Sequence, residues 1–109
     1  MSQDLFLELR DKQRILEKTL GEFGKRGREN ANAEMEYRIA LAEKILVERD
    51  KSTPVTIISD VCRGDRKIAK LKFDRDVAET MYDVAKESIQ VQKRGVTILS
   101  EQLDREYKG

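Results

Sequence analysis

The chain has 109 residues, of which 39% are charged and 6% aromatic, and it contains neither tryptophan nor histidine. Its 22 basic and 21 acidic residues leave a net charge of +1. No overall field therefore draws it to nucleic acid or to an anionic membrane surface. Without histidine, Ser-His and Cys-His catalytic pairs are excluded, and a single cysteine cannot build a thiolate zinc site. We expect no enzyme activity, no cofactor and no metal site.

Location is indicated by the same composition. The one cysteine, Cys62, cannot form an internal disulfide, which fits a reducing cytoplasm. The sequence has no apolar run long enough to span a bilayer and no secretion signal pattern. We expect a single elongated helical domain over residues 1–109, in the cytoplasm and away from the membrane, in which Cys62 acts as a small, partly buried apolar side chain.

The first predicted element is an amphipathic helix over about residues 3–51. Its apolar stripe is Leu5, Leu9, Leu16, Leu20 and Phe23, continued through Gly27, Ala31, Met35, Ile39, Ala42 and Leu46. Gly21, Gly24 and Gly27 interrupt it, and each costs about 1 kcal/mol relative to alanine inside a helix. Two interpretations stay open for residues 21–30, a break into a loop and a continuous helix with a kink. The continued stripe favours the continuous helix.

The chain is expected to reverse direction near its only proline. Because the residue before a proline avoids helical backbone angles, Thr53 is predicted to cap a short helix over about residues 54–63. Gly64 is predicted to end this helix as its C′ residue. Asp65 is then predicted to cap the helix that follows.

A long helix is predicted over about residues 65–107 from a heptad pattern. Steps of three and four from Ile68 reach mostly apolar a and d positions without a change of phase: Ile68, Leu71, Arg75, Ala78, Tyr82, Ala85, Ile89, Gln92, Val96, Leu99, Leu103 and Glu106. Such a seam is typical of helices that pack along their length. Together with the first helix, it predicts an all-α fold, a long antiparallel helical hairpin resembling a coiled coil, with a short helix at the bend.

The c and g positions of the same heptads are also apolar or small. They are Val77, Met81, Val84, Val91 and Ile98, with Ser88 and Gly95 between them. The four positions a, d, c and g cover roughly 160° of the helix surface, more than one neighbouring helix needs. We therefore predict that Val77, Met81, Val84, Val91 and Ile98 form an oligomer interface, most simply that of a homodimer.

A basic cluster surrounds the predicted reversal. It comprises Arg63, Arg66, Lys67, Lys70, Lys72 and Arg75. Such a local patch contacts phosphates in many nucleic-acid-binding proteins, although a solvated helix face is the more common reason for one. Phe73 is the only aromatic residue within it, so base stacking has little support.

Several short segments resemble a family of small helical proteins encoded by tailed phages and prophages of Gram-positive bacteria. The segments are Tyr37-Arg38, Thr53-Pro54-Val55-Thr56, Arg63-Gly64 and Gln102-Leu103-Asp104-Arg105-Glu106-Tyr107. The resemblance covers about residues 30–107. Members commonly end in Glu-Trp where this chain has Glu106-Tyr107, and the Gly-Lys-Arg-Gly stretch at residues 24–27 is unusual among them. The resemblance implies a host-cytoplasm location and a context of DNA metabolism, and it supplies no site residues.

The leading functional hypothesis is therefore a non-enzymatic helical interaction or assembly protein. One alternative is a DNA-associated accessory protein of phage recombination or replication that uses the basic cluster. A second alternative is an inhibitor of a host enzyme, which the sequence does not distinguish from the first two hypotheses. The hypotheses differ in partner: a second copy of the chain, nucleic acid, or another protein.

Overall fold

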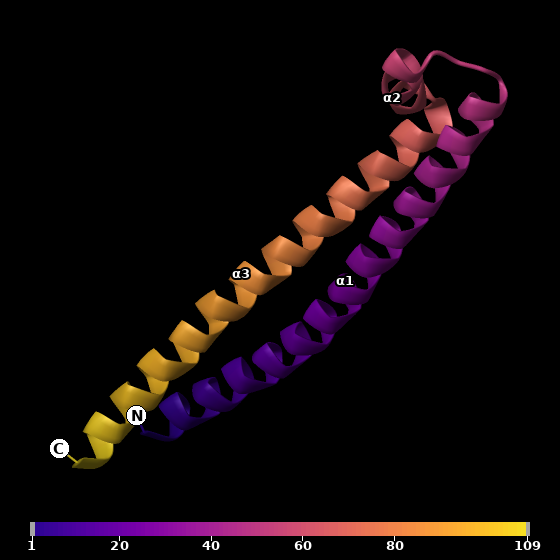
Figure 1. Cartoon of the computed structure of the whole chain (residues 1–109). Coiled ribbons are helices and arrows are strands. Elements are labelled where there is room, and N and C mark those ends of the chain that lie inside the picture. Colours follow the sequence, from indigo (N-terminus) through magenta and orange to yellow (C-terminus); the bar gives the residue numbers. More distant parts are fainter. Residues whose placement is uncertain (1, 109) are drawn as a thin grey trace. The chain divides into compact units, whose positions relative to one another are not determined.

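The computed structural model describes the backbone of residues 2–108 and the side chains of residues 3–108. It contains three α-helices, α1 (Ser2–Asp50), α2 (Val55–Gly64) and α3 (Arg66–Lys108) (Figure 1). Over these residues there is no β-strand. The all-α class and the helical hairpin with a short intervening helix are confirmed. α1 continues without interruption through residues 21–30, so the glycine segment is not a loop.

The helices are grouped into two compact units. One unit joins the N-terminal half of α1, up to Arg26, to the part of α3 that begins at Tyr82. The other, Gly27–Met81, contains the remainder of both long helices together with α2. Within each unit, α1 and α3 run side by side in opposite directions (Figure 1). The division of α1 falls inside its glycine segment.

The a/d seam of α3 forms the core of both units, as the heptad pattern predicts. In the unit that contains α2, Ile68 is only 3% exposed. In the other unit, Ala85, Ile89 and Leu99 are buried. Each fully buried large aliphatic side chain stabilises the fold by about 1.5–3 kcal/mol relative to its exposed state. The pairing of α1 with α3 therefore depends on this seam.

Polar and aromatic contacts align the helices in the unit that contains the chain ends. Gln92, at a seam position, donates hydrogen bonds from Nε2 to Thr19 Oγ1 at 2.9 Å and to Ser88 Oγ at 3.1 Å. Phe23 stacks on Tyr82 with ring centroids 4.8 Å apart. These contacts give the amide nitrogen of Gln92 its partners, while its Oε1 is buried without one, and they fix which residues of α1 face α3.

A charged residue has the same role in the unit that contains α2. The guanidinium of Arg75, also a seam position, lies 4.6 Å from the centroid of the Tyr37 ring. Its Nε is 3.5 Å from Glu34 Oε2, and its Nη2 donates a hydrogen bond to Asp76 Oδ1 at 3.0 Å. This hydrogen bond, followed by the charges of Asp76 and Glu34, raises the pKa of Arg75 despite partial desolvation.

The apolar stripe predicted for the C-terminal half of α1 is wrong. Met35, Ile39 and Leu46 are about half exposed, whereas Ala40 and Glu48 are buried. The prediction used consecutive steps of four residues, and each such step turns 40° beyond one full helical turn. Four of these steps rotate the stripe by about 160°, to the opposite side of the helix. The face that packs contains Tyr37, Ala40, Leu41, Lys44 and Glu48 instead.

α1 ends in a Schellman motif with serine at the left-handed position. Ser52 has φ 62°, and its N–H donates to Arg49 O at 3.0 Å. The N–H of Thr53 donates to Glu48 O at 3.1 Å, which completes the paired bonds of this motif. Because its backbone is held against α1, the Thr53 hydroxyl donates to Glu48 Oε1 at 3.3 Å.

The prediction that Thr53 caps α2 is therefore wrong, since α2 has Pro54 at its N-cap without a side-chain hydrogen bond. The prediction that Gly64 is the C′ residue of α2 is also wrong. Gly64 is the last helical residue of α2, and no described glycine has a positive φ. Asp65 makes the turn instead, with extended backbone angles (φ −67°, ψ 130°) and its N–H bonded to Cys62 O. Its predicted role as N-cap of α3 is confirmed, because Oδ2 accepts the Ile68 N–H at 3.2 Å.

Ser52→Gly is expected to stabilise the protein. A non-glycine residue pays about 1 kcal/mol in the left-handed region, and part of the gain is offset by the greater freedom of glycine in the unfolded chain. We expect the free energy of unfolding in urea to rise by about 0.5 kcal/mol. Ser52→Ala, which keeps a Cβ, is the matched control and is expected to bring no gain. A loss of stability in Ser52→Gly would contradict the assigned motif.

Gly21→Ala is expected to stabilise α1. Gly21 is helical and exposed, and a Cβ added there would meet nothing within 4 Å. Alanine is favoured over glycine in a helix interior by about 1 kcal/mol. Thermal unfolding followed by circular dichroism is expected to show a higher midpoint. An unchanged or lower midpoint would indicate that residue 21 is not helical in solution.

Candidate functional site

A cluster of charges holds the reversal together. Lys44 Nζ on α1 lies 3.5 Å from Glu48 Oε2 and 3.6 Å from Asp65 Oδ1, the cap of α3. Lys51 Nζ lies 3.5 Å from the same Glu48 oxygen. Glu48 is only 6% exposed, although it is ionisable. Two lysines therefore surround one buried carboxylate, and one of them links α1 to the start of α3.

Both carboxyl groups of this cluster have lowered pKa values. For Glu48, desolvation raises the pKa, but the charges of Lys44 and Lys51 outweigh it and the net shift is downward. For Asp65, the hydrogen bond from the Ile68 N–H is the main cause, and the charge of Lys44 adds to it against desolvation. Both groups are thus more stable as carboxylates in the folded protein than in the unfolded chain.

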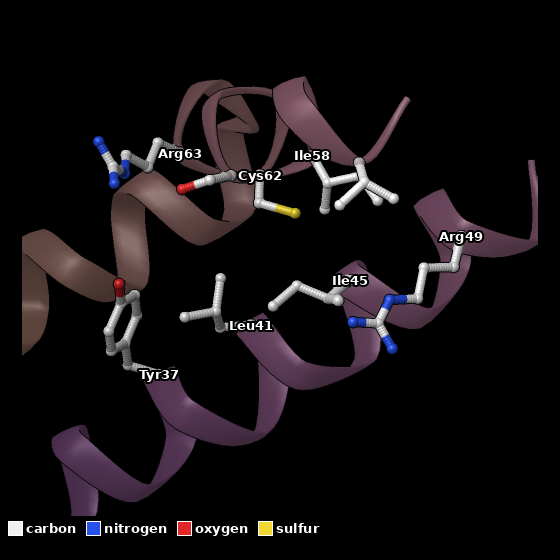
Figure 2. Close-up of a pocket in the computed structure, with 9 residues that line it drawn as sticks. Tyr37, Leu41, Ile45, Arg49, Ile58, Cys62 and Arg63 are labelled. Atoms are coloured by element: carbon white, nitrogen blue, oxygen red, sulfur yellow. The ribbon is translucent and has the colours of Figure 1, made fainter. Parts of the chain in front are cut away.

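The fixed reversal places α2 against α1 and leaves an apolar pocket between them (Figure 2). The pocket has a volume of about 410 Å³ and is open to solvent on one side. Its lining residues are Tyr37, Leu41, Ile45 and Arg49 of α1, with Val55, Ile58, Ser59, Cys62 and Arg63 of α2. The α1 residues recur at intervals of four, so they form an oblique row that winds about 120° around the helix. Size and lining resemble those of ordinary ligand-binding clefts.

The pocket has an apolar floor and two cations at its ends. Figure 2 shows Leu41, Ile45, Ile58 and Cys62 in its middle, with Arg49 at one end and Arg63 at the other. The lining includes no carboxylate. Neither arginine is within ion-pair distance of a carboxylate in the described part of the chain.

Cys62 is a floor residue and only 1% exposed, so the expectation of a small buried apolar side chain is confirmed and its burial exceeds the prediction. Sequence patterns did not indicate this pocket. Its residues come from two helices whose relative orientation is set by the reversal, and no spacing along the chain encodes that orientation.

Half of the predicted basic cluster, Lys70, Lys72 and Arg75, is paired with carboxylates. Lys70 donates to Asp74 at 2.6 Å, and Lys72 donates to Asp76 at 3.0 Å. Arg75 is held by Asp76, Glu34 and Tyr37, as described above. The remaining members, Arg63, Arg66 and Lys67, are exposed. The hydrogen bond from Lys72, then that from Arg75, lowers the pKa of Asp76, so these pairs persist at neutral pH. Nucleic-acid contact by this cluster stays a prediction.

The predicted oligomer interface residues lie on the surface. All five, Val77, Met81, Val84, Val91 and Ile98, are exposed, and Val91 is the most exposed at 66%. Val77 and Met81 belong to the unit with α2, and the other three belong to the unit with the chain ends. Along α3 they keep the heptad spacing that the buried seam shows. The helix therefore carries a second seam, here called the outer seam, which the described residues leave uncovered.

Two features of the outer seam stand out between Val84 and Ile98. Gly95 borders a hollow of about 230 Å³, which is also lined by Lys12, Ile15, Val91 and Gln92. Glu87 and Arg94 lie beside the same stretch, on the side of α3 that faces away from the buried a/d seam. They are one heptad apart and both exposed. Neither has an ion-pair partner in the described residues. The seam thus offers apolar side chains, a recess and charges of both signs.

Comparisons with known proteins identify no relative. No family model, no curated protein and no solved structure matches the chain. The resemblance to small phage proteins, with its implied location, therefore stays a prediction. Within the described residues, no three of the Asp, Glu and Cys side chains are grouped so that they would hold a metal ion. No helix among them is long and apolar enough to cross a bilayer.

Stability is expected to fall in acid. The pKa values of Glu48 and Asp65 are lower in the folded protein than in the unfolded chain. Their contribution is thus complete above the ordinary carboxyl values of about 4 and is lost as pH falls through the lowered ones. The free energy of unfolding should be nearly constant from pH 7 to about 5 and then decline. Glu48→Gln with Asp65→Asn is expected to lower stability at pH 7 and to flatten the decline. An unchanged slope in this variant would contradict the cluster.

Proposed function

We propose that this protein is a non-enzymatic assembly protein whose chain pairs with a second copy through the outer seam of α3. The observation that carries the proposal is the exposed heptad repeat of Val84, Val91 and Ile98, because the apolar a/d seam of the same helix is already occupied by α1. Exposed apolar side chains in a continuous row mark interaction sites. A row with coiled-coil spacing accepts another helix with the same spacing.

The outer seam is self-complementary when two copies of α3 lie antiparallel. In this arrangement Val84 faces Gly95 of the second copy, and Ser88 faces Val91. Each small residue then meets a larger one, and the hollow beside Gly95 accepts a side chain of the second copy. A parallel pairing in register places Gly95 opposite Gly95 and leaves a void, which costs stability.

The flanking charges favour the same arrangement. Glu87 of each copy lies next to Arg94 of the other, so the symmetric pair contains two such contacts. Exposed ion pairs contribute about 0.2–1 kcal/mol each, so these two select the orientation more than they supply affinity. The apolar seam supplies the affinity.

The first test measures the mass in solution. Sedimentation equilibrium of the wild-type chain is expected to give twice the chain mass of 12.6 kDa at micromolar concentration. Val91→Glu puts two carboxylates in the centre of the interface and is expected to give a monomer with unchanged helix content. Leu46→Glu introduces the same side chain at an exposed apolar position of α1 and is the matched control, expected to remain dimeric. A wild-type monomer at these concentrations would contradict the proposal.

The second test concerns orientation. Glu87→Arg or Arg94→Glu alone places like charges next to each other and is expected to weaken the dimer about tenfold, since 1.4 kcal/mol corresponds to that factor. The double variant Glu87→Arg/Arg94→Glu restores both pairs and is expected to dimerise like the wild type. Independent, additive losses in the double variant would exclude the antiparallel pairing.

A further inference from the structure

The pocket between α1 and α2 has properties that self-association leaves unused. All of its residues belong to Gly27–Met81, whereas the stretch proposed for pairing, Val84 to Ile98, belongs to the other unit. Ile58 and Cys62 line it as buried residues, while Val55 at its rim is 83% exposed. An apolar floor that opens to solvent between two helices is a groove of the kind that accepts a third helix.

Length and shape of the groove match a short helical segment. The α1 row runs over thirteen residues, from Tyr37 to Arg49, and its ends lie about 18 Å apart along the helix axis. A third helix of about three turns lies along such a row and presents an apolar side chain every third or fourth residue. With about 410 Å³ to fill, the groove has room for several such side chains.

Charge decides which helix fits. Arg49 and Arg63 stand at opposite ends of the groove without carboxylate partners in the described residues, and no acidic side chain lines it (Figure 2). A second copy that docked groove to groove would bring only these cations together, which costs affinity through like-charge repulsion. A segment with carboxylates at both ends of an apolar face pairs with both arginines.

We propose that this groove binds an acidic amphipathic helix of another protein, with apolar anchors on the floor formed by Leu41, Ile45, Ile58 and Cys62. Carboxylates near the two ends of the bound helix contact Arg49 and Arg63. The Tyr37 and Ser59 hydroxyls in the lining are available for hydrogen bonds at its edges. This inference goes beyond self-association and does not depend on it.

The test uses a fluorescent helical peptide of about three turns, stapled on its polar face so that it does not pay the cost of folding. One form carries leucines at three- and four-residue spacing between terminal glutamates, and a second form carries lysines in place of the glutamates. Fluorescence anisotropy is expected to show that wild-type protein binds the glutamate form about tenfold more tightly than the lysine form. Amide NMR shifts are expected at Leu41, Ile45 and Cys62.

Charge reversal in the protein is expected to reverse this preference. Arg49→Glu/Arg63→Glu should weaken the glutamate peptide about tenfold and bind the lysine peptide more tightly than the wild type does. Arg28→Glu/Arg66→Glu makes the same charge change at exposed positions outside the groove and is the matched control. It is expected to keep the wild-type preference, and circular dichroism verifies that both variants are helical.

Three results would overturn the inference. The first is that the two peptides bind the wild-type protein equally well. The second is that charge reversal at Arg49 and Arg63 changes peptide binding no more than charge reversal at Arg28 and Arg66. In the third, the amides of the groove shift with rising protein concentration in the absence of peptide, which assigns the groove to a second copy. These results can be told apart from failure of the proposed dimer. The dimer is tested by mass, and the peptide experiments can be repeated on Val91→Glu, whose substitution lies outside the groove.

Discussion

Burial of the a/d seam of α3 against α1 is the constraint on which the rest of the structure depends. The chain has few aromatic residues and no tryptophan, so small and medium aliphatic side chains must form its core. Ile68, Ile89 and Leu99 are buried along one face of one helix. That face of α3 is buried against α1 of the same chain. Any further apolar surface on α3 is then available only to another molecule, which gives the outer seam its significance.

The polar residues of the buried seam determine the alignment of the helices. Arg75 and Gln92 occupy seam positions and find their partners, Glu34 and Thr19, on α1. A shift of α1 by one helical turn would remove both sets of contacts at once. A buried polar group that loses its partner costs about 1–3 kcal/mol, so such a shift is strongly disfavoured. Apolar contacts hold the two helices together, and these polar contacts select one register among several of similar apolar burial.

Local patterns predicted those features that depend on one helix alone. The phase of α3, its cap at Asp65 and the exposure of Val77, Met81, Val84, Val91 and Ile98 all follow from spacing within a single helix. The errors arose where spacing had to be carried across a long stretch or a turn. Steps of four residues accumulated a rotation that moved Met35, Ile39 and Leu46 to the wrong face. At the reversal, the Schellman motif at Ser52 took Thr53 away from α2, and Asp65 made the turn that was assigned to Gly64.

The groove between α1 and α2 lay beyond sequence reasoning for a related reason. Arg49 and Arg63 are fourteen positions apart and belong to different helices, and only the folded reversal, with Lys44 between Glu48 and Asp65, places them around one apolar floor. Within the sequence, Arg63 appeared as part of a basic cluster and Arg49 as an ordinary last-turn cation. Neither has a carboxylate partner among the described residues, and this shared feature is visible only in the folded structure.

Self-association and groove binding reinforce each other if both operate. A symmetric dimer carries two grooves, so a partner with two acidic amphipathic segments on a linker of suitable length engages both at once. The second contact is then intramolecular, and avidity exceeds the affinity of one groove by a factor of about 10²–10⁴. A single groove with two rim charges supports only modest affinity, because exposed ion pairs contribute little. Pairing through α3 would thus let two weak grooves bind a bivalent partner tightly, and in preference to a monovalent one, without any new contact in either groove.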